Sequence, residues 1–274
     1  MITIEYLGEF GNKMFEYVFA RLLSEANNIN LDASCPLPET NVKRFNEPKN
    51  KKGTVVIGDE IFRSNNPDSK LLKLSPDYDY VIRGFFQDAD LCNKRVDQIR
   101  GFFDIDYPYS LNDRTLVTVR LADFIWNGYN SEIIHYDYYK KALSKIKGNV
   151  DVSVGGKRSA SSKYGVPENL ATEEQEEKYL SHFVKDTFNR LPKQEDFLDE
   201  FTSNFKYKTM ILSNSTWAWW AGFLSNCTEI YTFAKTGWFT PGDHKCHGIH
   251  VKNLHNIRNI STSIDGDFID ITKL

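Results

Sequence analysis

A strand that runs into a polar turn and then into an apolar helix occurs twice in this sequence, and this repeated unit constrains the fold most. Alternating β-branched residues at 2–7 predict a strand, the turn "GEFGNK" follows at 8–13, and apolar residues at helical spacing predict a helix over 13–26. The segment "ILSNSTWAWWAGFLS", residues 211–225, has the same order. Because backbone N–H groups and the helix dipole can hold an anion in such a unit, both turns are candidate sites.

The rest of the chain continues the alternation of strands and helices, which predicts the α/β class with parallel sheets in two lobes, 1–107 and 108–274. The run 114–124 is typical of a buried strand, and 136–147 has a helical pattern. A polar loop then leads into a helix expected near 179–191, which Pro192 ends, and another is expected at 195–205. Further strands are expected at 29–33, 54–59, 150–156, 208–214 and 229–234, and 80–90 is expected to be a strand that runs into a polar turn.

The amino-acid composition limits which classes of molecule the protein is expected to bind. The 274 residues are 41% hydrophobic and 26% charged, which is ordinary for a folded chain with a sizeable core. A formal net charge of -3 gives no overall basic field, so nucleic acid is not an expected partner, although it stays open as an acceptor. No apolar run has the length of a membrane span, and the N-terminus does not resemble a signal peptide. Scattered cysteines without metal or redox spacing predict free thiols in the cytoplasm: Cys35, Cys92, Cys227 and Cys246.

The first turn, Gly8–Lys13, has two interpretations. It is either a tight connection between strand and helix or a cradle for a phosphate or a sugar, with Asn12 and Lys13 as its polar groups. Glycine costs backbone entropy on folding, so two glycines in this turn indicate that something needs open space next to the main chain.

The strand at 114–124 carries Arg120 and Asp123, which are costly in a buried strand unless they are paired or face a site. A structural ion pair between them is one interpretation. The other places Arg120 at the carboxyl end of the strand, where open α/β sheets bind ligands and where a guanidinium can neutralise a leaving diphosphate.

The second turn offers hydroxyl and N–H groups from Asn214, Ser215 and Thr216 at a helix N-terminus, which suits a phosphate. Simple capping of the helix is the alternative. For Trp219 and Trp220 in the same helix, a place in the core is the preferred interpretation.

These segments together resemble the α-1,2-fucosyltransferases, family 11 of the glycosyltransferases. "GEFGNKMFEYVFARLL" resembles their GRxGNQxFQYxxA opening, "VIRGFFQD" their GYFQ segment and "VTVRLADF" their VHxRRGDY segment. "ILSNSTWAWWAGFLS" is similar to their NSSFSWWxAWL segment, and "AKTGWF" to an element before the C-terminus. The five motifs occur in the family's order over nearly the whole chain.

The resemblance implies a GT-B-like fold, in which two Rossmann-like lobes hold the donor site in a cleft, with the acceptor side in 1–107 and the nucleotide sugar in 108–274. It implies an enzyme, an inverting and metal-independent hexosyltransferase of carbohydrate metabolism. L-fucose from GDP-fucose would move to a hydroxyl of a glycan acceptor, without a cofactor. Arg120 matches the family's diphosphate-binding arginine.

The expected site residues fall into three groups. Arg120 and Glu9 are expected to be catalytic. The acceptor is expected at Phe85, Gln87, Asn130, Glu132 and His135, the last three also being interpretable as an ordinary loop and helix cap. The donor is expected at Gly8, Phe10, Gly11, Asn12, Lys13, Thr118, Arg120, Asp123, Asn214, Ser215, Thr216 and Trp217.

Several positions depart from the family pattern. Glu9 replaces its arginine and Lys13 its glutamine, Thr118 stands where it has histidine, and Leu121-Ala122 replaces Arg-Gly. Another nucleotide sugar as donor, and a non-catalytic nucleotide-sugar or glycan-binding relative, therefore remain alternatives. An inverting transfer needs a base for the acceptor hydroxyl, and Glu9 is either that base or a surface turn residue.

The stretch "HKCHGIH" contains His244, Cys246, His247 and His250, but its spacing fits no standard zinc pattern, so no metal site is expected.

Overall fold

The computed structural model describes residues 1–274 except 41, 59–70, 122–132, 156–170, 193–195 and 235–253. The chain divides into two compact units. Unit 1 comprises Met1–Asp106 with His247–His250, and unit 2 comprises Tyr107–Cys246 with Val251–Leu274. Both units are α/β with a parallel sheet, which confirms the predicted class.

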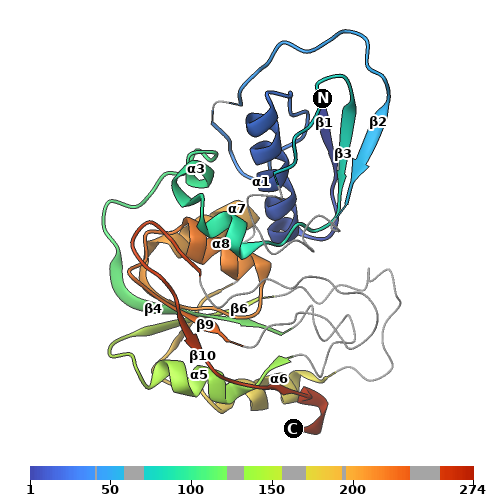
Figure 1. The fold of residues 1–274 in the computed structure, drawn as a ribbon. Helices are drawn as coiled ribbons and strands as arrows, with labels where there is room; N and C mark the ends of the chain where they lie inside the picture. The colour runs from blue at the N-terminus through green and yellow to red at the C-terminus, as the bar shows by residue number, and fades with distance from the viewer. Residues whose placement is uncertain (41, 59–70, 122–132, 156–170, 193–195, 235–253) are drawn as a thin grey trace. The chain divides into compact units, whose positions relative to one another are not determined.

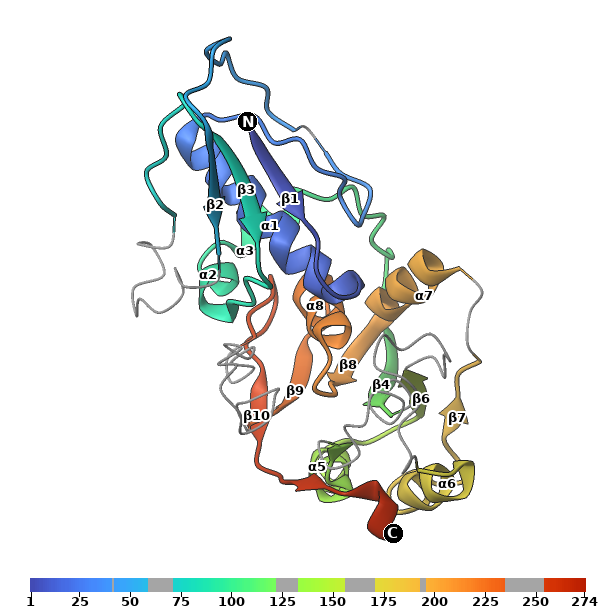
Figure 2. The same ribbon diagram turned by 90° about the vertical axis from the view of Figure 1, so that its right-hand side faces the viewer.

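Unit 1 is built on a three-stranded parallel sheet in the order β1-β3-β2. Its strands are β1 (Ile2–Glu5), β2 (Thr54–Ile57) and β3 (Asp79–Arg83). The helix α1 (Phe10–Asn27) covers one face of this sheet in both views (Figures 1 and 2). Two short helices, α2 (Ala89–Asn93) and α3 (Val96–Arg100), follow β3. The strand expected at 29–33 is reduced to a single bridge between Leu31 and Ile2.

The helix α1 begins three residues earlier than its apolar pattern predicts. Glu9 has an extended backbone and serves as the N-cap, so Phe10, Gly11 and Asn12 form the first turn. Twelve of the 18 residues are buried, including the polar Glu16 and Arg21. A helix with so little solvent-facing surface belongs to the core of its unit.

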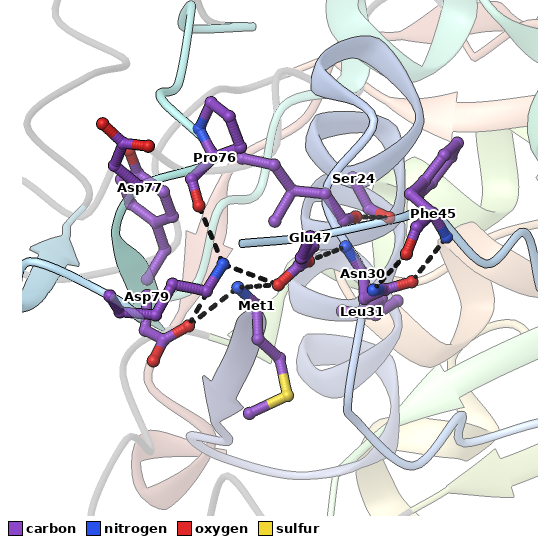
Figure 3. A network of polar contacts seen from close by, with 12 residues as sticks. Met1, Ser24, Asn30, Leu31, Phe45, Glu47, Pro76, Asp77 and Asp79 are labelled. Carbon is purple, nitrogen blue, oxygen red and sulfur yellow. Dashed lines mark hydrogen bonds and ion pairs between the residues drawn. The ribbon is translucent and has the colours of Figure 1, made fainter. Parts of the chain in front are cut away.

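Polar contacts fix the long segment between α1 and β2 at the start of the sheet (Figure 3). Glu47 accepts a hydrogen bond from the backbone N–H of Asn30 and pairs with Lys51 at 2.7 Å and with the amino group of Met1 at 3.0 Å. That amino group also lies 2.8 Å from Asp79. Burial opposes ionisation of Glu47, but the hydrogen bonds from Lys51 and Asn30 prevail and lower its pKa to about 2.

Unit 2 is built on a six-stranded sheet in the order β10-β9-β8-β4-β6-β7, and every neighbouring pair is parallel. The strands are β4 (Asn112–Arg120), β6 (Val150–Gly155), β7 (Asn189–Arg190), β8 (Tyr207–Ile211), β9 (Glu229–Phe233) and β10 (Thr262–Ile264). A small antiparallel pair joins β5 (Ile133–Ile134) to β11 (Phe268–Ile269).

The unit 2 sheet lies between two layers of helices. In both views α5 (Tyr136–Leu143) and α6 (Glu173–Ser181) lie on one face, and α7 (Phe197–Ser203) and α8 (Thr216–Leu224) lie on the other (Figures 1 and 2). The described part of the unit also contains 3₁₀ turns at Asn204–Lys206 and Ile271–Lys273. Coverage of both faces explains the nearly continuous apolar run of β4.

The prediction of a helix near 179–191 is wrong in its position. The structure places α6 at Glu173–Ser181, where Thr172 and Gln175 form a reciprocal capping box that fixes its start. Asn189 and Arg190 instead pair with β6 as an edge strand.

A buried carboxylate ties four strands together at the amino edge of the unit 2 sheet. Asp151 of β6, which is 3% exposed, accepts hydrogen bonds from Arg114 of β4 at 2.8 Å, Asn189 of β7 at 2.9 Å and Tyr207 of β8 at 2.8 Å. Burial opposes the charge on Asp151, but these hydrogen bonds prevail and lower its pKa to about 2. These hydrogen bonds to one charged carboxylate therefore link the strands β7, β6, β4 and β8.

Candidate functional site

The strand order of unit 2 places a topological switch point between β4 and β8. From β4 the chain builds outward through β6 and β7, and it then returns to the other side of β4 to add β8, β9 and β10. Open α/β sheets bind ligands outside the carboxyl ends of the strands at such a point. Arg120 is the last residue of β4, and Asn214 follows β8 and precedes α8.

The structure brings these two predicted site residues together. The Nη1 atom of Arg120 lies 3.5 Å from the carbonyl oxygen of Asn214, so the half-buried guanidinium reaches the turn that leads into α8. Asn214 is buried, at 4% exposure. The site thus combines a fixed cation with a helix N-terminus, both of which favour a bound anion.

The N-terminus of α8 is capped without help from a side chain. Ser215, the N-cap residue, has an extended backbone, makes no side-chain cap hydrogen bond and is only partly buried. Thr216 is buried, at 8% exposure, and Trp217 is partly exposed with its ring against Phe201 at 5.6 Å. The first N–H groups of a helix have no partner within it, so this end can donate to a ligand.

Thr118, an expected donor residue, makes hydrogen bonds within the protein through its hydroxyl. The side chain is 4% exposed, its Oγ1 accepts a hydrogen bond from the N–H of Ser213 at 2.9 Å, and it lies 3.3 Å from the carbonyl oxygen of Ile211. Thr118 therefore ties the end of β4 to the turn after β8 and sets the course of the chain into α8.

Two tyrosines support the same strand ends from the opposite face. Tyr138 donates to the carbonyl oxygen of Leu212 at 2.7 Å, and Tyr139 donates to that of Thr118 at 3.3 Å. Burial raises the pKa of both phenols, which therefore stay protonated donors. The sequence analysis did not identify these residues, because only the packing of α5 under the sheet reveals their role.

Trp219 and Trp220 lie in the core as preferred from the sequence, at 1% and 0% exposure. Their indole rings meet edge to face at 5.0 Å, and this packing anchors α8 behind the site.

In unit 1 the structure groups four predicted residues around the carboxyl ends of β1 and β3. Gly8 has φ +68, and a Cβ atom there would lie 2.2 Å from the side-chain nitrogen of Asn12 and 3.2 Å from the ring of Phe85. Gln87 donates to the side-chain oxygen of Asn12 at 2.8 Å. The positive φ favours glycine at position 8, and any larger residue there would also displace the side chain of Asn12.

Glu9 lies at the exposed start of α1. Its carbonyl oxygen accepts from the N–H groups of Asn12 and Lys13 at 2.9 and 3.0 Å, whereas its carboxylate caps no N–H group of the helix. Phe10 and Gly11 complete the first turn. A carboxylate that is not used in capping, at the positive end of an 18-residue helix, is available to an incoming group.

The turn after β3 has an unusual backbone. Gly84 has φ +148, and Phe86 has φ +48, a conformation that is rare for a bulky residue. Phe86 is held in place by burial, at 2% exposure, and by stacking on Phe19 at 4.3 Å. Such strain persists only where the surroundings enforce it, and it occurs often at functional sites. Here it directs Phe85 and Gln87 toward the Gly8 turn.

The other predicted residues fall into two groups. Asp123, Asn130 and Glu132 lie outside the described residues, as does the "HKCHGIH" stretch. His135 caps α5 through its Nδ1, which accepts from the N–H of Asp137 at 3.2 Å, and its ring lies tilted against that of Tyr136, with the centroids 4.1 Å apart.

Cys35, Cys92 and Cys227 are free thiols, as predicted. Among the described residues, no helix combines the length and apolarity needed to cross a membrane.

No family model and no curated protein matches the sequence. Two solved structures are similar at a low level. Heptosyltransferase WaaC from E. coli, solved with ADP, is 9% identical, covers 96% of this chain and 92% of its own, and has a TM-score of 0.43. TibC, an iron-containing dodecameric glycosyltransferase from enterotoxigenic E. coli, is 13% identical, covers 90% of this chain and 63% of its own, and has a TM-score of 0.39. At these values neither likeness carries an argument about function, and the resemblance to the family 11 fucosyltransferases stays a prediction.

Proposed function

We propose that this chain is a glycosyltransferase that moves a sugar from a nucleotide diphosphate donor to a hydroxyl of a glycan. The observation that carries the proposal is the convergence of Arg120 with the turn before α8 at the switch point of unit 2, where Nη1 lies 3.5 Å from the carbonyl oxygen of Asn214. A guanidinium beside a helix N-terminus suits a diphosphate, because each of the two groups can neutralise part of its negative charge.

The proposed reaction inverts the configuration of the sugar. The carboxylate of Glu9 takes the proton of the acceptor hydroxyl, and the hydroxyl oxygen forms a bond to the anomeric carbon of the donor. The bond from that carbon to the diphosphate oxygen breaks, and its electron pair stays on the diphosphate. Arg120 and the α8 dipole stabilise this growing negative charge.

GDP-fucose is the first donor to test, because the five motifs follow the order of the fucosyltransferases. Another nucleotide sugar remains the alternative, since Thr118 replaces a donor-site histidine of that family and its hydroxyl is bonded to the Ser213 turn. We assign charge neutralisation to Arg120 and α8, so transfer should continue in excess EDTA.

A panel of nucleotide sugars tests the proposal through release of nucleoside diphosphate, measured with and without glycan acceptors. Release that depends on an acceptor supports a transferase. Binding of a nucleotide sugar with no release from any donor would favour a non-catalytic nucleotide-sugar-binding protein. A melting shift by UDP or dTDP nucleotides without one by GDP would exclude fucose; ligand at 100 times its Kd should stabilise by about 2.7 kcal/mol.

A further inference from the structure

The helix α1 contains a fully buried carboxylate that the proposed reaction does not use. Glu16 is 0% exposed, and both of its oxygens accept the backbone N–H of Leu7, at 3.2 Å for Oε1 and 3.0 Å for Oε2. Burying a carboxylate costs free energy unless hydrogen bonds compensate for the lost water. These two hydrogen bonds connect the buried carboxylate to the main chain directly before Gly8.

The segment that Glu16 holds has little packing of its own. Leu7, Gly8 and Glu9 are all exposed, and Leu7 is 37% exposed despite its apolar side chain. Hydrophobic burial therefore cannot fix the conformation of this segment. The hydrogen bonds from the Leu7 amide to Glu16 do so instead, and the side chain of Asn12 lies so close to Gly8 that a Cβ atom there would be 2.2 Å from its nitrogen.

We propose that Glu16 is a positioning residue, which fixes the main chain at Leu7 so that the Glu9 carboxylate stands in the geometry needed to take a proton. This inference rests on the proposed function of Glu9. A misplacement of about 1 Å in a reacting group can cost about 10²-fold in rate, so a group that acts only through the backbone can still govern catalysis.

Amide hydrogen exchange tests the contact without reference to activity. In the wild-type protein the Leu7 amide should exchange at least 100-fold more slowly than an unprotected amide. Glu16→Gln keeps one acceptor oxygen and should retain most of this protection, whereas Glu16→Leu should abolish it. Glu25→Gln is the matched control, because Glu25 lies on the same helix but pairs with Arg21 and Lys43 at 3.5 and 3.3 Å. It should leave Leu7 protected.

Kinetics separate positioning from a purely structural role. With a donor and acceptor that the release assay identifies, Glu16→Leu should lower kcat for transfer about 10²-fold while the donor Kd stays within twofold. Glu16→Gln should restore transfer to within about tenfold of wild type. Glu25→Gln should change stability but not kcat.

The outcomes distinguish this inference from the proposed function. If the wild-type protein turns over no donor, the proposed function fails, and the positioning of Glu9 for proton removal fails with it, even where exchange confirms the contact at Leu7. If the wild-type protein is active and Glu16→Leu loses protection at Leu7 but keeps its kcat, the positioning inference is overturned and the transferase stands. Rapid exchange of Leu7 in the wild-type protein would also overturn it, and this measurement needs no variant to fold.

Discussion

Replacing Thr118 by valine tests whether the Thr118 hydroxyl stabilises the turn between β8 and α8. Valine has nearly the same shape but no hydroxyl, so the N–H of Ser213 loses the acceptor that lies 2.9 Å away. Ser213 is 5% exposed, so water has little access to replace that acceptor. A buried group left without its partner costs about 1–3 kcal/mol, and we expect the free energy of unfolding to fall by this amount.

The same substitution should weaken nucleotide binding, since the released turn carries Asn214 and leads into the N-terminus of α8. A Kd about tenfold weaker would correspond to about 1.4 kcal/mol of lost binding. Thr118→Ser is the control, because it keeps the hydroxyl and removes one methyl group, at a cost of about 0.8 kcal/mol for the lost apolar contact. Its nucleotide affinity should stay close to that of wild type.

Urea unfolding followed by tryptophan fluorescence measures the stability of both variants, and calorimetric titration with the nucleoside diphosphate of the active donor measures binding. The reasoning about Thr118 is refuted if Thr118→Val unfolds within 0.5 kcal/mol of wild type, a margin that surface substitutions commonly show, and binds the nucleotide normally. It is also refuted if Thr118→Ser weakens binding more than Thr118→Val does.

Three further predictions concern charged groups. Arg120→Ala should lower kcat about 10²–10³-fold and Arg120→Lys should restore it only in part, because lysine lacks the guanidinium fork; an unchanged kcat in steady-state assays would make Arg120 a structural residue. Glu9→Gln should keep donor binding and lower transfer about 10²–10⁴-fold with less effect on donor hydrolysis by water, and near-normal transfer would identify Glu9 as a turn residue. The pKa of Asp151 is lowered to about 2, so its stabilisation of about 2 kcal/mol is present above its usual pKa of 3.8 and is lost as pH falls toward 2. Urea unfolding between pH 6 and 2.5 should show a shallower loss for Asp151→Asn than for wild type, and equal slopes would contradict this assignment.

The sequence predicted correctly those helices and strands whose local apolar pattern matches their burial in the folded protein. The strand β4 combines an apolar run with burial on both faces, and α8 follows a polar turn that stops the preceding strand. Local periodicity placed α6 wrongly, since Tyr179 and Leu180 are its only buried residues and their pattern continues into 182–191. The Thr172 capping box was the signal that could have located its start.

The sequence indicated the candidate site residues but not the contacts that support them. Arg120 and Asn214 could be selected because a charged or polar residue at the end of an apolar strand is unusual. The hydroxyl of Thr118 has the same chemistry whether it faces a ligand or a neighbouring turn, so only the tertiary structure distinguishes the two. The strained backbone at Phe86 has no signal in the sequence, because its cause is the packing of that ring against Phe19.

The two phenols of α5 have a consequence for the thermodynamics of ligand capture. Tyr138 and Tyr139 are adjacent on one helix, yet they hold the carbonyl groups of Leu212, which follows β8, and of Thr118, which lies in β4. We therefore expect the fluctuations of these two segments to be correlated, because a displacement of α5 would move both carbonyl groups together. A site whose parts move as one body loses less conformational freedom when it closes on a ligand than one assembled from independent loops. Binding there should accordingly show a small entropic penalty from the protein, which backbone order parameters of Thr118 and Leu212 with and without nucleotide would reveal as nearly unchanged.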